Sequence, residues 1–241
     1  MHAFEAFTQL VRTLTGKSTI STITDVQNAE QLAFLRSLKQ QQSRNKEALL
    51  MPLDQLELVV FDIETTGFRP QKGDEIISIG AVKMNGLQVV EETFYTLVKP
   101  TQHIPQNIIE LTGIDQEMTA KAPTLREALL AFLIFAKGCT LVAHHANHER
   151  NFMKHYSQQL LQTPFNQRIV DTAFLIQICE YNHTLVTLDD VCLHQQIPII
   201  GRHHALGDAK MTAQVWLKYV QQAMNLGCDN LQDVYERFAR L

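Results

Sequence analysis

The chain has few cysteines and only a small excess of charge. Its 241 residues include 4 cysteines, and the formal net charge at neutral pH is −4. The cysteines are far apart and form no Cys-x-x-Cys pair. This excludes a disulfide scaffold and a zinc ribbon, and it favours the reducing cytoplasm. The weakly acidic balance excludes a protein that coats duplex nucleic acid by charge alone, but it permits a small local nucleic-acid site.

Long apolar segments are also missing. No run is long enough to cross a bilayer, and the first residues alternate apolar with polar side chains instead of forming the apolar stretch of a secretory signal. We therefore expect no membrane partner. Hydrophobic residues make up 45% of the chain and charged residues 19%, which is the composition of a globular protein with a sizeable core.

Several common catalytic motifs are absent. The chain has no Gly-x-Ser-x-Gly elbow, no P-loop and no Gly-x-Gly-x-x-Gly turn, which disfavours a serine hydrolase and the usual nucleotide-binding loops. Its 10 histidines suggest a zinc site, and His148-Glu149 begins a zincin-like motif. Phe152 stands where that motif needs its second histidine, so the sequence argues against a catalytic zinc.

The pattern of the chain changes near residue 55. Residues 1–55 carry apolar side chains at helical spacing and then a polar stretch, which predicts a helical extension and linker. Thr24 and Gln27 have the spacing of a capping box and predict the start of a second helix there. Residues 56–241 form the predicted main domain. The extension either packs on this domain or docks a protein partner.

The main domain opens with three runs rich in β-branched and aromatic residues, separated by turns that contain glycine or asparagine. These runs predict an antiparallel three-stranded meander. Short apolar runs and amphipathic helical patterns alternate after it, which implies a mixed sheet flanked by helices, an α/β fold. The later elements are predicted as helices at about 124–137, 147–161, 187–197 and 205–224, a strand at 140–144 and a strand leading into a helix at 168–180.

The strongest local signal is the sequence FDIETTG, residues 61–67, which ends an apolar strand. Because strand side chains alternate between faces, Asp62 and Glu64 point to the same side. Two neighbouring carboxylates at the end of a buried strand repel each other and lose hydration, so a cation should offset them. Oxygen ligands of this kind prefer Mg²⁺ or Mn²⁺. The alternative is a strand end at which both acids are simply solvated.

Two further segments combine acids with histidines. His203 precedes Asp208 by five residues at the start of the last long helix. There the acid can complete a metal site, and the histidine can act as a general base near neutral pH. Residues 142–152, VAHHANHERNF, run from a strand into a helix. If the site takes an acid from this segment, the acid must be Glu149, since no other lies between Glu127 and Asp171.

In this order, the three segments resemble the DEDDh 3′–5′ exonuclease superfamily, the ribonuclease H-like nucleases that include the proofreading epsilon subunit of bacterial DNA polymerase III. The resemblance runs from about Leu56 to Gln222. The sister subgroup has a tyrosine four residues before the last acid, where this chain has His204, so the histidine subgroup is indicated. The resemblance implies a ribonuclease H-like exonuclease fold with a mixed sheet of five to six strands flanked by helices.

The resemblance also implies a two-metal phosphodiesterase that releases nucleoside 5′-monophosphates from the 3′ ends of DNA or RNA. Asp62, Glu64 and Asp208 would hold one ion of Mg²⁺ or Mn²⁺, and Glu149 would support a second. His203 would take the proton from the attacking water.

Residues that would bind the terminal nucleotide follow from the same comparison and from the local charge. They are Thr65, Thr66, Gly67, Leu111, Ile114 and His144. For Leu111 and Ile114, packing in the core is the alternative. His144 belongs to one group of histidine and basic side chains, and Arg202 belongs to another beside His203. Both groups would attract phosphate if they line the cleft. Asp171 is expected to support the site from behind.

The segment around Glu149 departs from the family pattern. The motif His-Asn-Ala-x-Phe-Asp becomes His-His-Ala-Asn-His-Glu, residues 144–149. Glutamate keeps the charge but adds a methylene, whereas ligand positions must be accurate to about 0.5 Å. Two functions stay open: a 3′–5′ exonuclease acting on single-stranded 3′ ends, and a non-catalytic module that binds nucleic-acid ends or, through residues 1–55, a polymerase or another protein. The sequence leaves the choice between DNA and RNA open.

Overall fold

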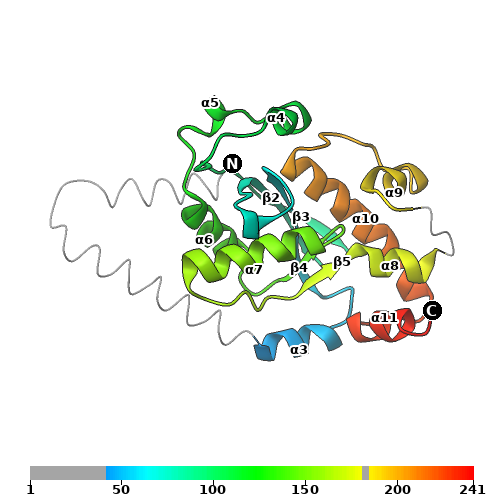
Figure 1. Cartoon of the computed structure of the whole chain (residues 1–241). Helices are drawn as coiled ribbons and strands as arrows, with labels where there is room; N and C mark the ends of the chain where they lie inside the picture. Colours follow the sequence, from blue (N-terminus) through cyan, green and yellow to red (C-terminus); the bar gives the residue numbers. More distant parts are fainter. Residues whose placement is uncertain (1–41, 181–184) are drawn as a thin grey trace.

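The computed structural model describes residues 42–180 and 185–241 (Figure 1). The helices predicted before residue 42, including the capping box at Thr24, lie outside these ranges. In chain order the elements are α3 (Gln42–Leu50), β1 (Glu57–Thr65), the 3-10 helix η1 (Pro70–Lys72), β2 (Ile76–Asn85), β3 (Gln88–Leu97), α4 (Gln106–Thr112), α5 (Gln116–Thr119), α6 (Leu125–Phe135), β4 (Thr140–Ala143), α7 (Asn147–Leu161), β5 (Ile169–Asp171), α8 (Thr172–Cys179), α9 (Leu188–His194), α10 (Ala205–Asn225) and α11 (Leu231–Phe238).

A five-stranded sheet of order β3-β2-β1-β4-β5 forms the centre of the described residues. Strands β1, β2 and β3 are antiparallel neighbours, and Gly80 on β2 lies between Asp62 on β1 and Tyr95 on β3. Strands β4 and β5 continue on the other side of β1 as parallel strands. The predicted meander and the mixed sheet flanked by helices are therefore confirmed, with five strands.

Side-chain alternation along β1 divides the core into two layers. Val59, Phe61 and Ile63 pack with residues of α6 and α7, whereas Leu58 and Val60 pack with residues of α8, α10 and α11. Figure 1 shows α6 at the left of the sheet and α10 at the right. Even-numbered residues share one side of a strand, so Asp62 and Glu64 continue the side that faces α10.

Capping residues set the starts of α6 and α9. Thr124 forms a capping box with Glu127 at the start of α6, and Thr187 forms one with Asp190 at the start of α9. The range predicted for α7 is confirmed, and α10 ends within one residue of its predicted end. Gly138 takes a left-handed φ of 89° and turns the chain from α6 into β4.

Helices α4, α5 and α11 were not predicted from the sequence. The first two are too short to show a period of their own. Helix α11 begins with a capping box between Asn230 and Asp233, and it buries Leu231 and Val234. These signals are visible in the sequence, but the helix gains its stability from the layer that it covers.

The residues just before β1 pack on the main domain. Leu53 is fully buried and Leu56 nearly so, in the same core cluster as α11. The backbone N–H of Leu53 donates to the Asp229 carbonyl oxygen at 2.9 Å. The predicted division at residue 55 stays a prediction, and these contacts show that residues close to it on both sides bury apolar side chains.

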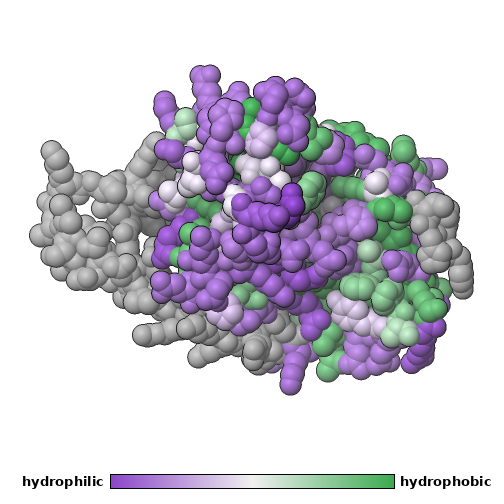
Figure 2. Space-filling model, in the orientation of Figure 1, coloured by the Kyte–Doolittle hydropathy of each residue, from purple (hydrophilic) through white to green (hydrophobic). Residues whose placement is uncertain are grey.

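The outward side of α7 is polar, as its amphipathic sequence requires. In the view of Figure 2, hydrophilic side chains cover the middle of the molecule, where Figure 1 places α7. Its inward side buries Phe152, Met153 and Tyr156. Within the described ranges, no helix combines the length and the apolar character that a membrane crossing needs.

Gly80 determines how closely α10 approaches the sheet. A Cβ atom at this position would lie 2.1 Å from the Leu206 nitrogen and 2.2 Å from the Ala205 carbonyl carbon. The first turn of α10 therefore rests directly on the backbone of β2, next to Asp62 on β1. This contact brings Asp208, in the same turn, towards the acids of β1.

We predict that Gly80→Ala lowers the free energy of unfolding by about 3 kcal/mol, because the new methyl group meets helix backbone that cannot move without shifting α10. Urea unfolding followed by circular dichroism measures this change. Gly113→Ala is the control: its Cβ meets nothing within 4 Å, although φ is 70°. The left-handed conformation alone should cost the control about 1 kcal/mol. Equal losses in the two variants would contradict the close-contact argument.

Candidate active site

Three carboxylates converge where β1 meets the start of α10. Asp62, Glu64 and Asp208 each offer an oxygen, and these oxygens lie within 4.8 Å of one another. The first two come from the side of β1 that faces α10, and the third comes from the first turn of that helix. The structure thus brings together the acids of the two segments that the sequence singled out.

Glu149 supplies a fourth acid from the opposite layer. It lies in the first turn of α7 and is only 3% exposed. Strand β4, which precedes α7, is the parallel neighbour of β1, so their carboxyl ends meet at one edge of the sheet. The negative charge of Glu149 raises the pKa of Asp62, but Glu149 lies outside the cluster of the other three acids. It therefore borders this cluster.

Burial and mutual repulsion both disfavour the ionised acids. Burial is the first cause that raises the pKa of Asp62, followed by the charges of Glu149, Glu64 and Asp208. Burial also raises the pKa of Glu64 to about 7 and that of Glu149 to about 8. The same cause raises the pKa of Asp208. A cation between these groups would favour their ionised forms.

Two carboxylate oxygens at the site lack a hydrogen-bond partner. Asp208 Oδ1 and Glu149 Oε2 are buried, and neither has a partner in the described part of the chain. Buried polar atoms are normally paired, so unpaired oxygens beside other carboxylates need an explanation. An acidic, all-oxygen donor set is what Mg²⁺ and Mn²⁺ prefer. The residues present therefore fit a divalent cation.

Arg202 places one positive charge beside the acids. Its Nη1 donates to Asp208 Oδ2, and its Nε donates to Asp189 Oδ1 at 2.5 Å. The guanidinium lowers the pKa of Asp62, Glu64 and Asp208, although burial outweighs this effect. The sequence grouped Arg202 only with side chains that attract phosphate, and Asp189 carried no motif. Only the fold brings α9 close enough to pair them.

The backbone around His203 is held on both sides. The N–H of His203 donates to Asp208 Oδ2 at 3.3 Å. His204 stacks on Tyr95, with ring centroids 4.4 Å apart and an interplanar angle of 22°. His203 itself has φ of 56°, a left-handed conformation that is uncommon for a residue with a side chain. Such a conformation persists when the surrounding contacts impose it.

Asp171 organises the loop between β4 and α7. Its carboxylate accepts hydrogen bonds from the backbone N–H groups of His145, Ala146 and Ala173, at 3.0 to 3.1 Å. The same side chain caps the start of α8. Asp171 therefore holds the turn that leads to Glu149, which agrees with the supporting role expected for it.

His144 lies in this loop and is neutral at physiological pH. Burial is the main cause that lowers its pKa to about 3. Its Nδ1 lies 2.7 Å from the Thr172 hydroxyl, whereas its buried Nε2 has no partner in the described residues. His144 can therefore form a hydrogen bond to a ligand, but it does not supply the positive charge expected for phosphate attraction.

The turn after β1 uses much of its own hydrogen-bonding capacity. The Thr66 N–H donates to the Glu75 carbonyl, and the Thr66 hydroxyl accepts from the Glu75 N–H, both at 2.8 Å. The Thr65 hydroxyl donates to the Gly67 carbonyl at 2.6 Å and lies 3.3 Å from His148 Nε2. A Cβ at Gly67 would come within 2.5 Å of the Asp74 carboxylate. The turn is thus rigid, and Thr66 is already paired.

The structure separates the two apolar residues predicted to bind the terminal base. Leu111 on α4 is 50% exposed, whereas Ile114 is 2% exposed. Ile114 packs in a core cluster with Ile77, Ile104 and Ile108. Ile114 therefore has the core-packing role that the sequence left as an alternative, and Leu111 is the residue of the pair with surface to offer.

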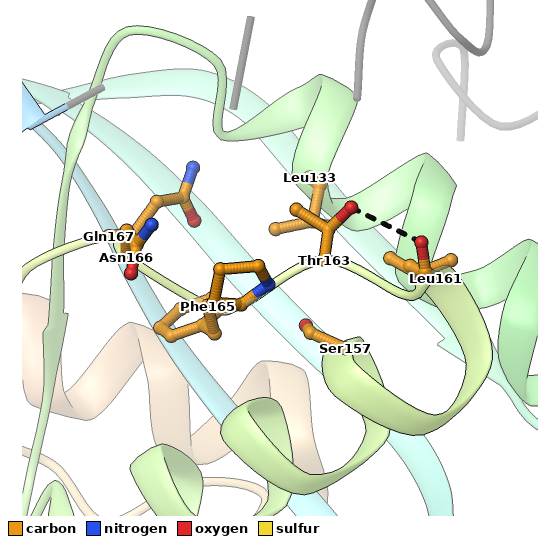
Figure 3. A pocket seen from close by; sticks show the side chains of 8 residues that line it. Leu133, Ser157, Leu161, Thr163, Phe165, Asn166 and Gln167 are labelled. Atoms are coloured by element: carbon orange, nitrogen blue, oxygen red, sulfur yellow. Dashed lines mark hydrogen bonds between the residues drawn. The ribbon is translucent and has the colours of Figure 1, made fainter. Parts of the chain in front are cut away.

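The described part of the chain also has a small cavity between α6, α7 and the loop that follows α7 (Figure 3). Its lining includes Leu133, Ser157, Phe165 and Gln167, and its volume of about 10 Å³ suffices for one water molecule. Ser157 is eight residues beyond Glu149 on the same helix, which corresponds to about 12 Å. The cavity is therefore separate from the acidic cluster.

Comparison with known proteins identifies relatives of this chain. The family model RNase_T, described as "Exonuclease", matches residues 59–216. A DNA polymerase III PolC-type protein of Caldanaerobacter subterraneus subsp. tengcongensis is 38% identical over 178 residues, which are 74% of this chain and 12% of that protein. A DNA polymerase III subunit epsilon-like protein of Rhodobacter capsulatus is 39% identical over 174 residues, 69% of this chain and 24% of that protein. The chain thus spans only a small part of the length of these relatives.

Solved structures support the same fold. The nuclease domain of 3′hExo, a DEDDh family member bound to rAMP, superposes with a TM-score of 0.60 at 22% identity, covering 72% of this chain and 94% of that chain. E. coli Exonuclease I in complex with a dT13 oligonucleotide gives a TM-score of 0.63 at 13% identity, covering 72% of this chain and 43% of that chain. The family model and the relatives confirm the exonuclease family indicated by the sequence, and the solved structures share its fold.

We predict that the metal-free protein loses stability as the pH rises from 6.5 to 8. Glu64 and Glu149 have pKa values of about 7 and about 8 in the folded chain, above their ordinary value of 4.5. The folded state therefore holds protons that the unfolded state releases, and it is destabilised as these acids ionise. Burial lowers the pKa values of His144 and His148, which reduces stability only below about pH 6.5.

Thermal unfolding in a chelator at pH 6.5, 7, 7.5 and 8 tests this prediction. The wild-type midpoint should fall across the series, and Glu149→Gln should flatten the fall because glutamine stays neutral. A midpoint that rises or stays level in the wild type would show that burial does not raise the pKa of these acids in the folded chain.

Proposed function

Because the chain belongs to the RNase_T exonuclease family, we propose that it is a metal-dependent 3′–5′ exonuclease that releases nucleoside 5′-monophosphates from single-stranded 3′ ends. The supporting observation is the convergence of Asp62, Glu64 and Asp208, with buried Glu149 at their border. DNA is the first substrate to test, since the relatives are named DNA polymerase III PolC-type and DNA polymerase III subunit epsilon-like protein.

Each acid has a distinct place in this proposal. Asp62, Glu64 and Asp208 would hold one divalent ion, Mg²⁺ or Mn²⁺, and Glu149 together with Asp62 would support a second. When bound, the two ions supply charge stabilisation to the attacking and leaving oxygens of the phosphodiester. The unpaired oxygens of Asp208 and Glu149 are free to take part in such binding.

His203 would take the proton from the attacking water. An imidazole suits this role, because its ordinary pKa lies near neutral pH. The His203 ring lies close enough to Asp208 for its charge to lower the pKa of that carboxyl. The Asp208 contact and the His204–Tyr95 stack hold the backbone that carries this ring.

The terminal nucleotide would contact the turn Thr65–Gly67 and the exposed side chain of Leu111. His144 would donate a hydrogen bond to a phosphate oxygen through its free ring nitrogen. Thr66 and Ile114 would act indirectly, because the first is bonded to Glu75 and the second is buried. The proposed contact surface is therefore smaller than the set of residues expected from the sequence.

A polymerase is the protein partner that the relatives suggest. Residues 1–55 lie outside the RNase_T match and would supply the contact with this partner. The proposed location of the protein is the cytoplasm. The competing function is an exonuclease fold that binds ends without cutting. The observation in its favour is Glu149, which replaces the shorter aspartate of the family motif and lies outside the cluster of three acids.

We predict that the protein shortens 5′-labelled single-stranded DNA from its 3′ end in Mg²⁺ or Mn²⁺. Asp62→Ala should lower the rate at least about a hundredfold, because loss of metal-based charge stabilisation costs several kcal/mol. His203→Ala should lower it about 100- to 10,000-fold, the usual contribution of a general base. Rates come from denaturing gels, with RNA of equal sequence in parallel.

Glu91→Ala is the matched control for this assay. Glu91 is an exposed acid of β3, four residues along the strand from Tyr95, which stacks on His204 beside the site. Its rate should equal the wild-type rate. If the wild type cuts neither DNA nor RNA with either metal, the enzyme proposal fails and the binding module is favoured.

We further predict that Glu149→Asp changes the metal preference. The shorter side chain restores the family's ligand length, so activity in Mg²⁺ should rise relative to activity in Mn²⁺. Rates in each metal, with Glu149→Gln as the neutral control, measure this ratio. An unchanged ratio would show that local backbone adjustment already compensates for the longer arm.

A further inference from the structure

We propose that Arg202 is a resident counter-cation of the acidic cluster, and that a divalent ion displaces its guanidinium from Asp208. The proposal rests on the function above, since it concerns the same site. It assigns to Arg202 a role in loading the metal, separate from any contact with nucleic acid.

The first support is the position of Arg202 between two acids on different helices. It pairs with Asp208, whose side chain is 7% exposed, and with Asp189 on α9, whose side chain is 43% exposed. One end of the guanidinium thus reaches the buried cluster, while the other lies near solvent. The arginine has a second anionic partner available whenever it leaves the first.

The second support is that Arg202 and a metal ion would need the same carboxylate. Asp208 Oδ2 accepts from Arg202 and from the His203 N–H, whereas Oδ1 is unpaired. A divalent ion held by the cluster would place a second cation at a buried carboxylate that already binds Arg202, and Coulomb repulsion there is little screened. The mobile side chain is the cation that can withdraw, and Asp189 can receive it.

The third support is the rigidity of the backbone on either side of Arg202. A Cβ at Gly207 would lie 2.1 Å from the Gly201 carbonyl oxygen, so the preceding residue is pressed against the first turn of α10. The following residue, His203, is bonded to Asp208 through its backbone N–H. The exchange would therefore involve side-chain rotation, and His203 would keep its place.

Variants of Arg202 and of its partner Asp189 distinguish displacement of Arg202 by the metal ion from a purely structural role of Arg202. Arg202→Gln removes the competitor and should tighten Mn²⁺ binding about tenfold, the equivalent of one charged hydrogen bond. Asp189→Asn removes the partner that receives the displaced side chain, so it should weaken Mn²⁺ binding by about threefold, since that solvent-exposed pair is worth less. Exchange thus predicts effects of opposite sign.

Calorimetric titration of the metal-free full chain with MnCl₂ measures these affinities. Lys210→Gln removes an exposed positive charge from α10 and is the matched control, with an affinity within about twofold of the wild type. A second readout is thermal unfolding in chelator at pH 8. Arg202→Gln should unfold at a lower temperature than the wild type, and saturating Mn²⁺ should remove most of the difference.

If Arg202→Gln and Asp189→Asn both weaken Mn²⁺ binding, Arg202 is only a brace and the inference is wrong. It is also wrong if neither variant changes the affinity. Asp189→Asn alters only the more exposed acid that pairs with Arg202. It therefore still shows whether losing this partner weakens Mn²⁺ binding, even if Arg202→Gln does not fold.

The digestion assay on the wild type distinguishes a failure of the inference about Arg202 from a failure of the proposed exonuclease function. If the wild type cuts, but Arg202→Gln and Asp189→Asn do not change the Mn²⁺ affinity in opposite directions, only the inference about Arg202 is overturned. If neither the wild type nor Arg202→Gln binds Mn²⁺, both proposals fail. Binding by Arg202→Gln but not by the wild type would support the exchange directly.

Discussion

The cost of holding like charges together in a buried place governs this site. Four acids are drawn from β1, α7 and α10, and burial raises the pKa of each. The fold offsets the cost in two ways. Glu149 and Asp208 lie in the first turns of their helices, where the positive end of the helix dipole favours an anion. Arg202 adds a full positive charge, yet the pKa values of Asp62, Glu64 and Asp208 stay raised beside it.

The geometry that gathers these acids depends on backbone contacts as much as on the acids. Gly80 lets α10 lie on β2, beside Asp62. Asp171 holds the loop that leads to Glu149. A small number of glycine and capping positions, none of them a metal-binding candidate, thus bring together side chains that are more than 140 residues apart in the sequence.

Helix α9 connects the two loops that carry the histidines of the site. His145 contacts the Val186 carbonyl oxygen just before α9, and Asp189 on α9 pairs with Arg202. A displacement of α9 would therefore reach both the loop before Glu149 and the segment that contains His203. If Arg202 exchanges partners, Asp189 keeps the displaced charge next to the site, so that the loaded and metal-free states differ by a side-chain movement.

Local patterns in the sequence determined most elements of the fold and the acids of the candidate site. Strand alternation puts Asp62 and Glu64 on one side, capping residues mark α6 and α9, and the spacing of His203 and Asp208 places them at the start of α10. The resemblance of ordered motifs then identified the family. These features are local, so the chain shows them without knowledge of distant contacts.

Only the tertiary structure decided which residues share an environment. It buried Ile114 and exposed Leu111, although both belong to one short segment. It paired Arg202 with Asp189, and it showed that Thr66 is already bonded to Glu75. The physical reason is that burial, ion pairing and pKa depend on groups that are distant in sequence and meet only when the layers pack.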